Sequence, residues 1–443
     1  MVQITNAQDA REAAVRMRPG VFTALAETEE IEQAATRASG TLGPLAGLPL
    51  AVKDNIHVAG LPNSAGTRSL REYAPQNHAP TVARLIDAGM VVLGKTNMHE
   101  LAVGITSSHG PFGDVPNAVD ESRVAGGSSG GSAVAVAAGV CQHALGTDTG
   151  GSTRIPAAFN DVWGFRPSTG RYDPTGVTSI AFSRDTVGPM AVSLEGIVAL
   201  DGALASPGPR LRFSNGGEVP LRVGVDFNDL EYCDDAVRSA FEIATDVLRD
   251  SLEIEFRPLN FGALDRQAAS LGAELAGHEL VPSLRSYLES DPALPTLSEV
   301  YAELSDPHVA YLIQRSLAMQ PNEDTWNPRW HRLMTDSARL RAAFTATLVG
   351  DSIDVIIRPT VAIRPPLISK VRRMKNSERD ELFGNVVRFT ALATLVGAPS
   401  LSLPLGPVLG KNMTGMLLDA LPGTDVRLLS AASRVEKILS SGR

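Results

Sequence analysis

Two turns rich in glycine and serine carry the residue types most able to do chemistry in this chain. The first, at 126–132, reads GGSSGGS, and the second, at 149–152, reads TGGS. Glycine permits backbone conformations that other residues resist, so several N–H groups can converge beside a serine hydroxyl. Such amides stabilise the oxyanion that forms when a hydroxyl attacks a carbonyl carbon. Because apolar segments flank both turns, the pattern favours acyl transfer over a flexible Gly/Ser linker.

A lysine in an apolar setting could supply the base that such a serine needs. Lys53 ends the run LPLAVK, which is typical of a short buried strand. A lysine after a strand is usually a solvated surface charge. Burial, however, lowers the pKa of a lysine because it disfavours the charged form, and a neutral amine accepts protons near neutral pH.

The elements that must position these residues alternate between strands and helices. Residues 80–104 are expected to form a helix, a strand and a second helix, and the apolar run at 143–146 is expected to be a strand. The small-residue segment after Ser132 predicts a helix capped by that serine. We therefore expect an α/β fold, a single large mixed β-sheet covered by helices on both sides, in one domain spanning 1–443.

Composition excludes several classes of function. The chain has 443 residues, 43% of them hydrophobic, and a mean hydropathy near zero, which is typical of a soluble globular protein. Its net charge of −9 argues against a nucleic-acid surface. Cys141 and Cys233 are too few for a disulfide framework and have no metal-binding spacing. With no signal-like leader and no apolar run of about 20 residues, we expect a cytoplasmic protein.

The motifs together resemble the amidase signature family. The similarity covers GGSSGGSA, GTDTGGSTRIPAAF and the upstream PLAGLPLAVKDNI, and it extends through GKTNMHELAVG to RPSTGRY and RDTVGPM, about residues 44–190. A lysine motif followed by both serine turns at the family's spacing is highly specific. The resemblance implies the amidase signature fold and an amidohydrolase that needs no cofactor and no metal.

The resemblance also implies a role for each matching residue. Ser152 would be the nucleophile, Lys53 the neutral base, and Ser128 the relay hydroxyl between them, placed by a cis Gly127–Ser128 peptide. The acyl-enzyme formed on Ser152 would then be hydrolysed by water. The oxyanion hole would consist of the backbone N–H groups of Thr149, Gly150, Gly151 and Ser152.

Four further residues are expected to support the two turns. Ser129 is expected to bond to the relay serine, and Ser132 either to act directly or only to cap the helix. Asp148 and Arg154 flank the second turn with opposite charges, so we expect a buried ion pair that stiffens it. The alternative for Arg154 is binding of a substrate carboxylate.

Three nearby residues look reactive without matching a catalytic role. Glu100 is expected to be structural, and His99 is not expected to take part in the chemistry. His109 lies in a loop that by resemblance runs beside the acyl pocket, where it either lines the pocket or is exposed. Because no histidine sits at a motif position for a Ser-His-Asp arrangement, the lysine takes its place.

The substrate and its pocket are less sharply specified. The variant FRPSTGRY is closer to bacterial amidases of the aryl-acetamide type, such as indoleacetamide and mandelamide hydrolases, than to the amidotransferase branch. Ala118 and Ala125 stand where the family commonly has proline. Residues 1–40 are expected to be N-terminal helices, and 207–350 a variable, mostly helical segment. Together with 105–125 and 172–190, this segment is expected to build the pocket.

Three functions compete at this point. The first is hydrolysis of a small aryl or alkyl carboxamide, or of a related carbamate or ester, with water and the amide as the only partners of a monomer or homodimer. The second is the glutaminase subunit of a tRNA-dependent amidotransferase, which requires a partner subunit. The third is a non-enzymatic, nucleotide-binding module, which the absence of a Gly-Lys-Ser/Thr phosphate loop disfavours.

Overall fold

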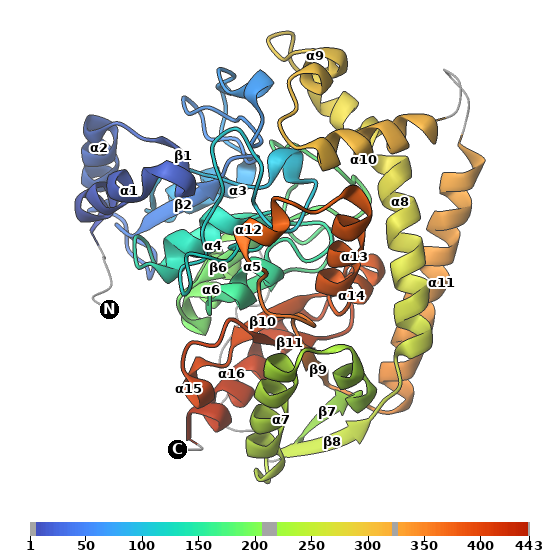
Figure 1. Cartoon of the computed structure of the whole chain (residues 1–443). Coiled ribbons are helices and arrows are strands. Elements are labelled where there is room, and N and C mark those ends of the chain that lie inside the picture. The colour runs from blue at the N-terminus through green and yellow to red at the C-terminus, as the bar shows by residue number, and fades with distance from the viewer. Residues whose placement is uncertain (1–5, 206–218, 321–326, 442–443) are drawn as a thin grey trace.

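Figure 1 shows a computed structural model of the chain, which describes residues 6–205, 219–320 and 327–441. Within these residues, eleven strands form one sheet in the order β1-β3-β2-β4-β6-β5-β10-β11-β9-β7-β8. The strands are β1 (Phe22–Leu25), β2 (Pro49–Lys53), β3 (Val91–Thr96), β4 (His143–Asp148), β5 (Trp163–Arg166), β6 (Thr186–Ala191), β7 (Leu221–Val225), β8 (Ile254–Pro258), β9 (Val355–Pro359), β10 (Ser400–Pro404) and β11 (Gly415–Asp419).

The sheet combines parallel and antiparallel pairs. Strand β2 runs parallel to β3 and β4, and β7 runs parallel to β8 and β9. The remaining pairs are antiparallel. The predicted α/β fold with one large mixed sheet is confirmed.

Helices pack on both faces of this sheet. They are α1 (Ala7–Val21), α2 (Thr28–Ala38), α3 (Pro80–Asp87), α4 (Gly130–Ala137), α5 (Arg154–Phe159), α6 (Leu194–Leu204), α7 (Asp235–Arg249), α8 (Gly262–Leu288), α9 (Leu297–Ala302), α10 (Pro307–Ala318), α11 (Pro328–Gly350), α12 (Ile368–Val371), α13 (Asn376–Val387), α14 (Ala391–Val396), α15 (Gly406–Leu409) and α16 (Asp425–Ser441). The long helices α8 and α11 lie side by side at one flank of the molecule (Figure 1). No helix in the described part of the chain is long and apolar enough to cross a bilayer.

Alternation along β2 decides which way Lys53 leaves the sheet. Leu50 and Val52 pack into the apolar cluster that includes α3 and α6, whereas Ala51 packs into the cluster that includes α4. Successive side chains of a strand point to opposite faces. Lys53, at the carboxyl end of β2, therefore leaves the strand on the α4 side, where the first serine turn lies.

Helix α4 begins three residues earlier than predicted. It starts at Gly130 with Ser129 at its N-cap position, so Ser132 lies in the first turn and does not cap the helix. The hydroxyl of Ser132 instead donates to the carbonyl of Leu145 at 2.9 Å and lies 2.7 Å from Thr96 Oγ1. Ser132 thus ties α4 to strands β3 and β4.

Two other stretches differ from the prediction. Residues 22–25, expected to be helical, form strand β1, whose alternating burial suits an edge strand paired antiparallel with β3. The helix expected after β3 is reduced to a 3₁₀ turn, Glu100–Ala102, because Leu101 and Ala102 adopt positive φ angles of 52° and 59°.

The close approach of α4 to its neighbours makes one glycine a sensitive position. We expect Gly131→Ala to lower the free energy of unfolding by about 1–3 kcal/mol. A Cβ there would lie 2.4 Å from Asn97 O and 2.7 Å from Val21 O, both of them backbone atoms. Urea unfolding followed by circular dichroism would measure the change.

Gly202 in α6 is the matched control, since a Cβ there has nothing within 4 Å. We expect Gly202→Ala to raise the free energy of unfolding by about 0.5–1 kcal/mol, because alanine loses less backbone entropy in a helix. Equal effects of the two substitutions would contradict the packing described for α4.

Candidate active site

Lys53 is fully buried, and its amine has two hydroxyl partners. Its Nζ donates to Ser128 Oγ at 2.8 Å and to Thr147 Oγ1 at 2.6 Å. Burial lowers the pKa of Lys53 to about 7, although the charges of Asp148 and Asp185 act to raise it. A large fraction of this amine is therefore neutral near pH 7.

Ser128 reaches Lys53 from an unusual backbone. The Gly127–Ser128 peptide bond is cis, as the resemblance implies. The Ser128 carbonyl accepts hydrogen bonds from the backbone N–H of His99 at 3.1 Å and from Ser107 Oγ at 3.4 Å. The serine is thus held at its carbonyl as well as at its hydroxyl.

Ser152 lies next to the first serine turn without a bond from its hydroxyl. The backbone N–H of Ser129 donates to the Ser152 carbonyl at 3.2 Å, which joins the two turns. Ser129 Oγ contacts the backbone N–H and carbonyl of Thr147, each at 3.2 Å, so it braces β4 and makes no contact with the relay hydroxyl. Among the residues that the structure describes, Ser152 Oγ has no hydrogen-bond partner, and its side chain keeps some access to solvent. The structure therefore brings Lys53 and Ser128 together but not Ser128 and Ser152.

The backbone of the second turn departs from the prediction at one residue. Gly151 N–H donates to Asp148 Oδ1 at 3.0 Å, so this amide is already engaged and does not face an oxyanion. Gly151 has a φ of +127°, which other residues rarely adopt, and a Cβ there would lie 2.5 Å from Thr390 Oγ1. The amides of Gly150 and Ser152 have no acceptor within the described ranges. Thr149 is held through its hydroxyl, which donates to Asp185 Oδ1 at 2.6 Å.

Asp148 and Arg154 form the predicted buried ion pair. Arg154 donates to both carboxylate oxygens, at 2.9 and 3.0 Å, and Arg166 donates to Oδ1 at 3.1 Å. Burial alone would raise the pKa of Asp148, but the charges of Arg154 and Arg166 outweigh burial and hold it well below its usual range. The guanidinium of Arg154 also bonds to Thr390, Thr394 and Ser400. Because its donors are used inside the protein, a substrate carboxylate is not its partner here.

The remaining predicted residues lie around this centre. Glu100 is structural, as expected, since its carboxylate accepts the backbone N–H groups of Ser305 and Asp306. His109 is half-buried, and its Nδ1 lies 3.1 Å from a guanidinium nitrogen of Arg379. It is therefore neither fully exposed nor bonded to Ser128 or Ser152.

Sequence reasoning missed three residues that hold the site. Thr147 contacts the amine of Lys53, Arg166 shares Asp148 with Arg154, and Asp185 holds Thr149. Each lies inside a motif that carries the family resemblance. Position within the motif was the available signal, but the partner of each side chain depends on the folded sheet.

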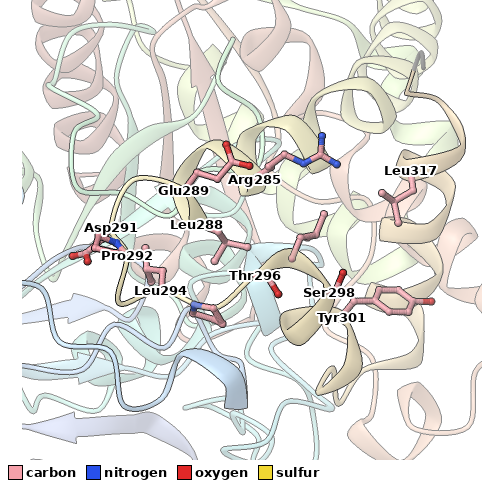
Figure 2. Close-up of a pocket in the computed structure, with 12 residues that line it drawn as sticks. Arg285, Leu288, Glu289, Asp291, Pro292, Leu294, Thr296, Ser298, Tyr301 and Leu317 are labelled. Atoms are coloured by element: carbon pink, nitrogen blue, oxygen red, sulfur yellow. The ribbon is translucent and has the colours of Figure 1, made fainter. Parts of the chain in front are cut away.

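Two hollows of the structure lie away from these residues. A groove of about 620 Å³ is lined by the end of α8, by α9 and by Leu317 of α10 (Figure 2). A much smaller cavity lies beside His99, His308 and Arg379. Lys53, Ser128 and Ser152 line neither hollow, so volume alone does not mark the reactive centre, and the chemistry of the side chains is the better guide.

Comparison with known proteins gives a consistent result. The family model described as Amidase matches residues 2–429. Mandelamide hydrolase of Pseudomonas putida is 35% identical over 431 residues, which covers 91% of this chain and 81% of that protein. Indoleacetamide hydrolase of Pseudomonas savastanoi is 34% identical and covers 89% of this chain and 84% of its own length.

A further relative and a solved structure extend the comparison. One subunit of the glutamyl-tRNA(Gln) amidotransferase of Thermus thermophilus is 34% identical, with 95% of this chain and 90% of that protein covered. The native peptide amidase of Stenotrophomonas maltophilia superposes with a TM-score of 0.81 at 27% identity, over 99% of this chain and 94% of that one.

The buried carboxylate of Asp148 is expected to stabilise the folded protein. We expect Asp148→Asn to lower the free energy of unfolding by about 3–5 kcal/mol, because it leaves two buried guanidinium groups without their counter-charge. Since folding depresses the pKa of Asp148, its stabilising contribution is present above the unfolded carboxyl's pKa. The difference from wild type should therefore shrink as the pH falls below about 4. Urea unfolding at several pH values measures it.

Asp336→Asn provides the control for this substitution. Its carboxylate pairs with Arg339 on the surface, with side-chain exposures of 39% and 73%. Removing such an exposed pair costs under about 1 kcal/mol. If Asp148→Asn were equally mild, the ion pair would not be needed to hold the second turn.

Proposed function

Because the chain belongs to the amidase family, we propose that this hydrolase of carbon–nitrogen bonds cleaves a small aryl or alkyl carboxamide through an acyl-enzyme on Ser152. One observation carries the proposal, namely the fully buried amine of Lys53, which lies 2.8 Å from Ser128 Oγ with its pKa lowered to about 7. A base must be unprotonated at working pH to accept a hydroxyl proton. Lys53 meets that requirement without a histidine.

The acylation step begins when substrate brings Ser152 Oγ within reach of Ser128. Lys53 accepts the proton of Ser128 while Ser128 takes the proton of Ser152, and Ser152 Oγ bonds to the amide carbon. The negative charge that forms on the carbonyl oxygen is stabilised by the N–H groups of Thr149, Gly150 and Ser152, the three predicted donors that are not engaged elsewhere in the described part of the chain. The carbon–nitrogen bond then breaks as Ser128 returns a proton to the departing amine, and Lys53 restores the proton of Ser128.

The second half of the reaction consumes water. A water molecule loses a proton to the same Ser128 and Lys53 pair and attacks the acyl carbon. The bond from that carbon to Ser152 Oγ breaks, and Ser152 regains its proton. Water thus completes a cycle that needs no cofactor, and esters or carbamates would pass through the same tetrahedral intermediates.

An aromatic pair supports an aryl preference. Phe182, which is 55% exposed, packs on Trp330 of α11 with ring centroids 5.6 Å apart. The loop of Phe182 is tied to the second turn, because Asp185 accepts the Thr149 hydroxyl at 2.6 Å and the Ala181 N–H at 3.0 Å. The names of the two hydrolases among the relatives refer to aryl-substituted acetamides. We therefore assign the acyl pocket to residues 105–125 and 172–190 and to the described part of 207–350, in one amidase domain. Residues 207–218 and 321–326 of that range lie outside the described residues.

A glutaminase subunit of an amidotransferase is the second candidate. The relative from Thermus thermophilus favours it, because the similarity extends over nearly the full length of both chains. Such a subunit depends on a partner, whereas a stand-alone amidase does not. Hydrolysis of small amides by the purified chain alone would therefore select the first candidate.

Covalent labelling tests the nucleophile and the base together. We expect a fluorophosphonate probe to add once to the wild-type chain, at Ser152, because that hydroxyl is activated and accessible. Ser152→Ala should abolish the adduct and lower kcat/KM for an arylacetamide by roughly 10⁴-fold or more. Lys53→Ala should slow labelling by a similar order. Intact-mass spectrometry and peptide mapping supply the readout.

Ser298→Ala, at an exposed serine of α9, should label at the wild-type rate. An adduct that persists in Ser152→Ala would contradict the assignment of the nucleophile. A wild-type chain that neither labels nor hydrolyses an amide panel would leave the partner-dependent function as the better account.

The lowered pKa of Lys53 predicts the pH dependence of the reaction. The free enzyme is active with the amine neutral, so kcat/KM for an uncharged amide should rise tenfold per pH unit up to about pH 7 and then level off. Initial rates between pH 5 and 9 measure this limb. Glu436→Gln controls for another group, because burial raises the pKa of Glu436 to about 7. That variant should show the same rise of kcat/KM up to about pH 7, whereas a rise that levels off near pH 4 would indicate a carboxylate base.

A further inference from the structure

His99 is a buried histidine that the proposed reaction does not use. It lies in the loop after β3, and the residue is 4% exposed. Its backbone N–H donates to the Ser128 carbonyl at 3.1 Å, so the residue touches the first serine turn through its main chain. What its imidazole contacts determines whether the ring also serves that turn.

The imidazole of His99 has a charged neighbour at Nε2 and two polar contacts at Nδ1, the longer of which is to Thr106 Oγ1 at 3.3 Å. Its Nδ1 accepts the backbone N–H of Ser107 at 3.1 Å. Because Nδ1 is an acceptor, the proton of the neutral ring lies on Nε2. Nε2 is 3.2 Å from Asp306 Oδ2, a distance suited to a charge contact, but the two atoms are not aligned as a hydrogen bond. The Ser107 contact is therefore better formed than the one to Asp306.

Ser107 fills the space under the first serine turn. Its φ of 53° lies in the left-handed region that serine seldom adopts, so the contact to His99 helps to hold a backbone conformation with an intrinsic cost. Ser107 Oγ accepts the N–H of Gly130 at 3.2 Å and donates to the Ser128 carbonyl at 3.4 Å. A Cβ on Gly127 or Gly130 would come within 2.9 or 2.6 Å of that same oxygen.

We infer that His99 is a positioning residue that sets the first serine turn through Ser107. Its ring fixes the N–H of Ser107, the Ser107 hydroxyl bridges the two residues on either side of Ser129, and Ser128 Oγ is thereby held at Lys53. The inference rests on the proposed function, because it assigns His99 to the placement of the relay serine. It assigns the ring no proton transfer and no contact with substrate.

The Asp306 side of the ring offers a rival explanation. Asp306 accepts from Arg379 at 2.5 Å and from the backbone N–H of His308 at 2.9 Å, so it caps α10 and binds α13. If His99 served only this carboxylate, it would be an anchor for those helices. Loss of the ring would then lower stability and leave the turnover of folded protein intact.

Two substitutions separate the two sides of the ring. The amide oxygen of His99→Asn can take the place of Nδ1 and accept from Ser107, whereas the amide nitrogen of His99→Gln takes the place of Nε2 and faces Asp306. We expect His99→Gln to lower kcat by about 10²-fold, the order of loss for a reactive group displaced by about an ångström. KM should change little, and His99→Asn should recover most of the lost kcat.

Asp306→Asn is the matched variant for the other side. It keeps the Ser107 contact, so we expect a lower melting temperature with kcat within a few-fold of wild type. Thermal unfolding of every variant shows that the protein measured is folded. Steady-state kinetics with one arylacetamide and the rate of fluorophosphonate labelling give the comparison.

Each outcome decides the assignment. His99→Gln at wild-type kcat, or His99→Asn as slow as His99→Gln, would overturn the role through Ser107. A loss of kcat in Asp306→Asn equal to that in His99→Gln would assign the ring to the helix anchor. If the wild-type chain does not hydrolyse amides, the proposed function itself is overturned. If the wild type is active and the His99 variants are as active as it is, only the role of His99 is overturned.

Discussion

Lys53 and Lys95 are both fully buried, and the candidate site depends on the difference between their partners. Lys95 lies 3.3 Å from the carboxylate of Asp54, whereas Lys53, at the end of the adjacent strand, meets only the hydroxyls of Ser128 and Thr147. Burial lowers the pKa of both amines, but only Lys53 has no counter-charge in contact to oppose it. Lys53 lies on β2 and Lys95 on its parallel neighbour β3, so the sheet determines which of the two amines lacks a carboxylate partner.

A second charge arrangement keeps the turns rigid beside that amine. Asp148 is shared by Arg154 and Arg166, and its oxygens also accept backbone amides of the turn that carries Ser152. A carboxylate with two guanidinium partners remains ionised and cannot serve as an acid near neutral pH. The candidate site therefore combines a carboxylate and two guanidinium groups that stay ionised near neutral pH with one amine whose pKa is lowered to about 7.

The fold class and the contact between Lys53 and Ser128 could be predicted from the sequence, because they depend on hydrophobic patterning and on local motifs. Lys53, Ser128 and the Asp148–Arg154 pair are placed as their motifs indicate. Strand β1 was missed because four residues between two helical patterns carry too little periodic signal. The engaged N–H of Gly151 was missed because it depends on the orientation of a side chain in the folded sheet. Contacts such as that of His99 with Asp306 join residues far apart in the sequence. A single sequence contains no local pattern from which such a contact could be predicted.

Glu100 connects the segment after β3 to the turn between helices α9 and α10. Its buried carboxylate accepts the N–H groups of Ser305 and Asp306, between α9 and α10, and those amides belong to the backbone. A contact made by backbone amides survives exchange of the side chains around it. The link between Glu100 and the start of α10 is therefore independent of which side chains occupy positions 305 and 306, proline excepted, because proline has no N–H to donate.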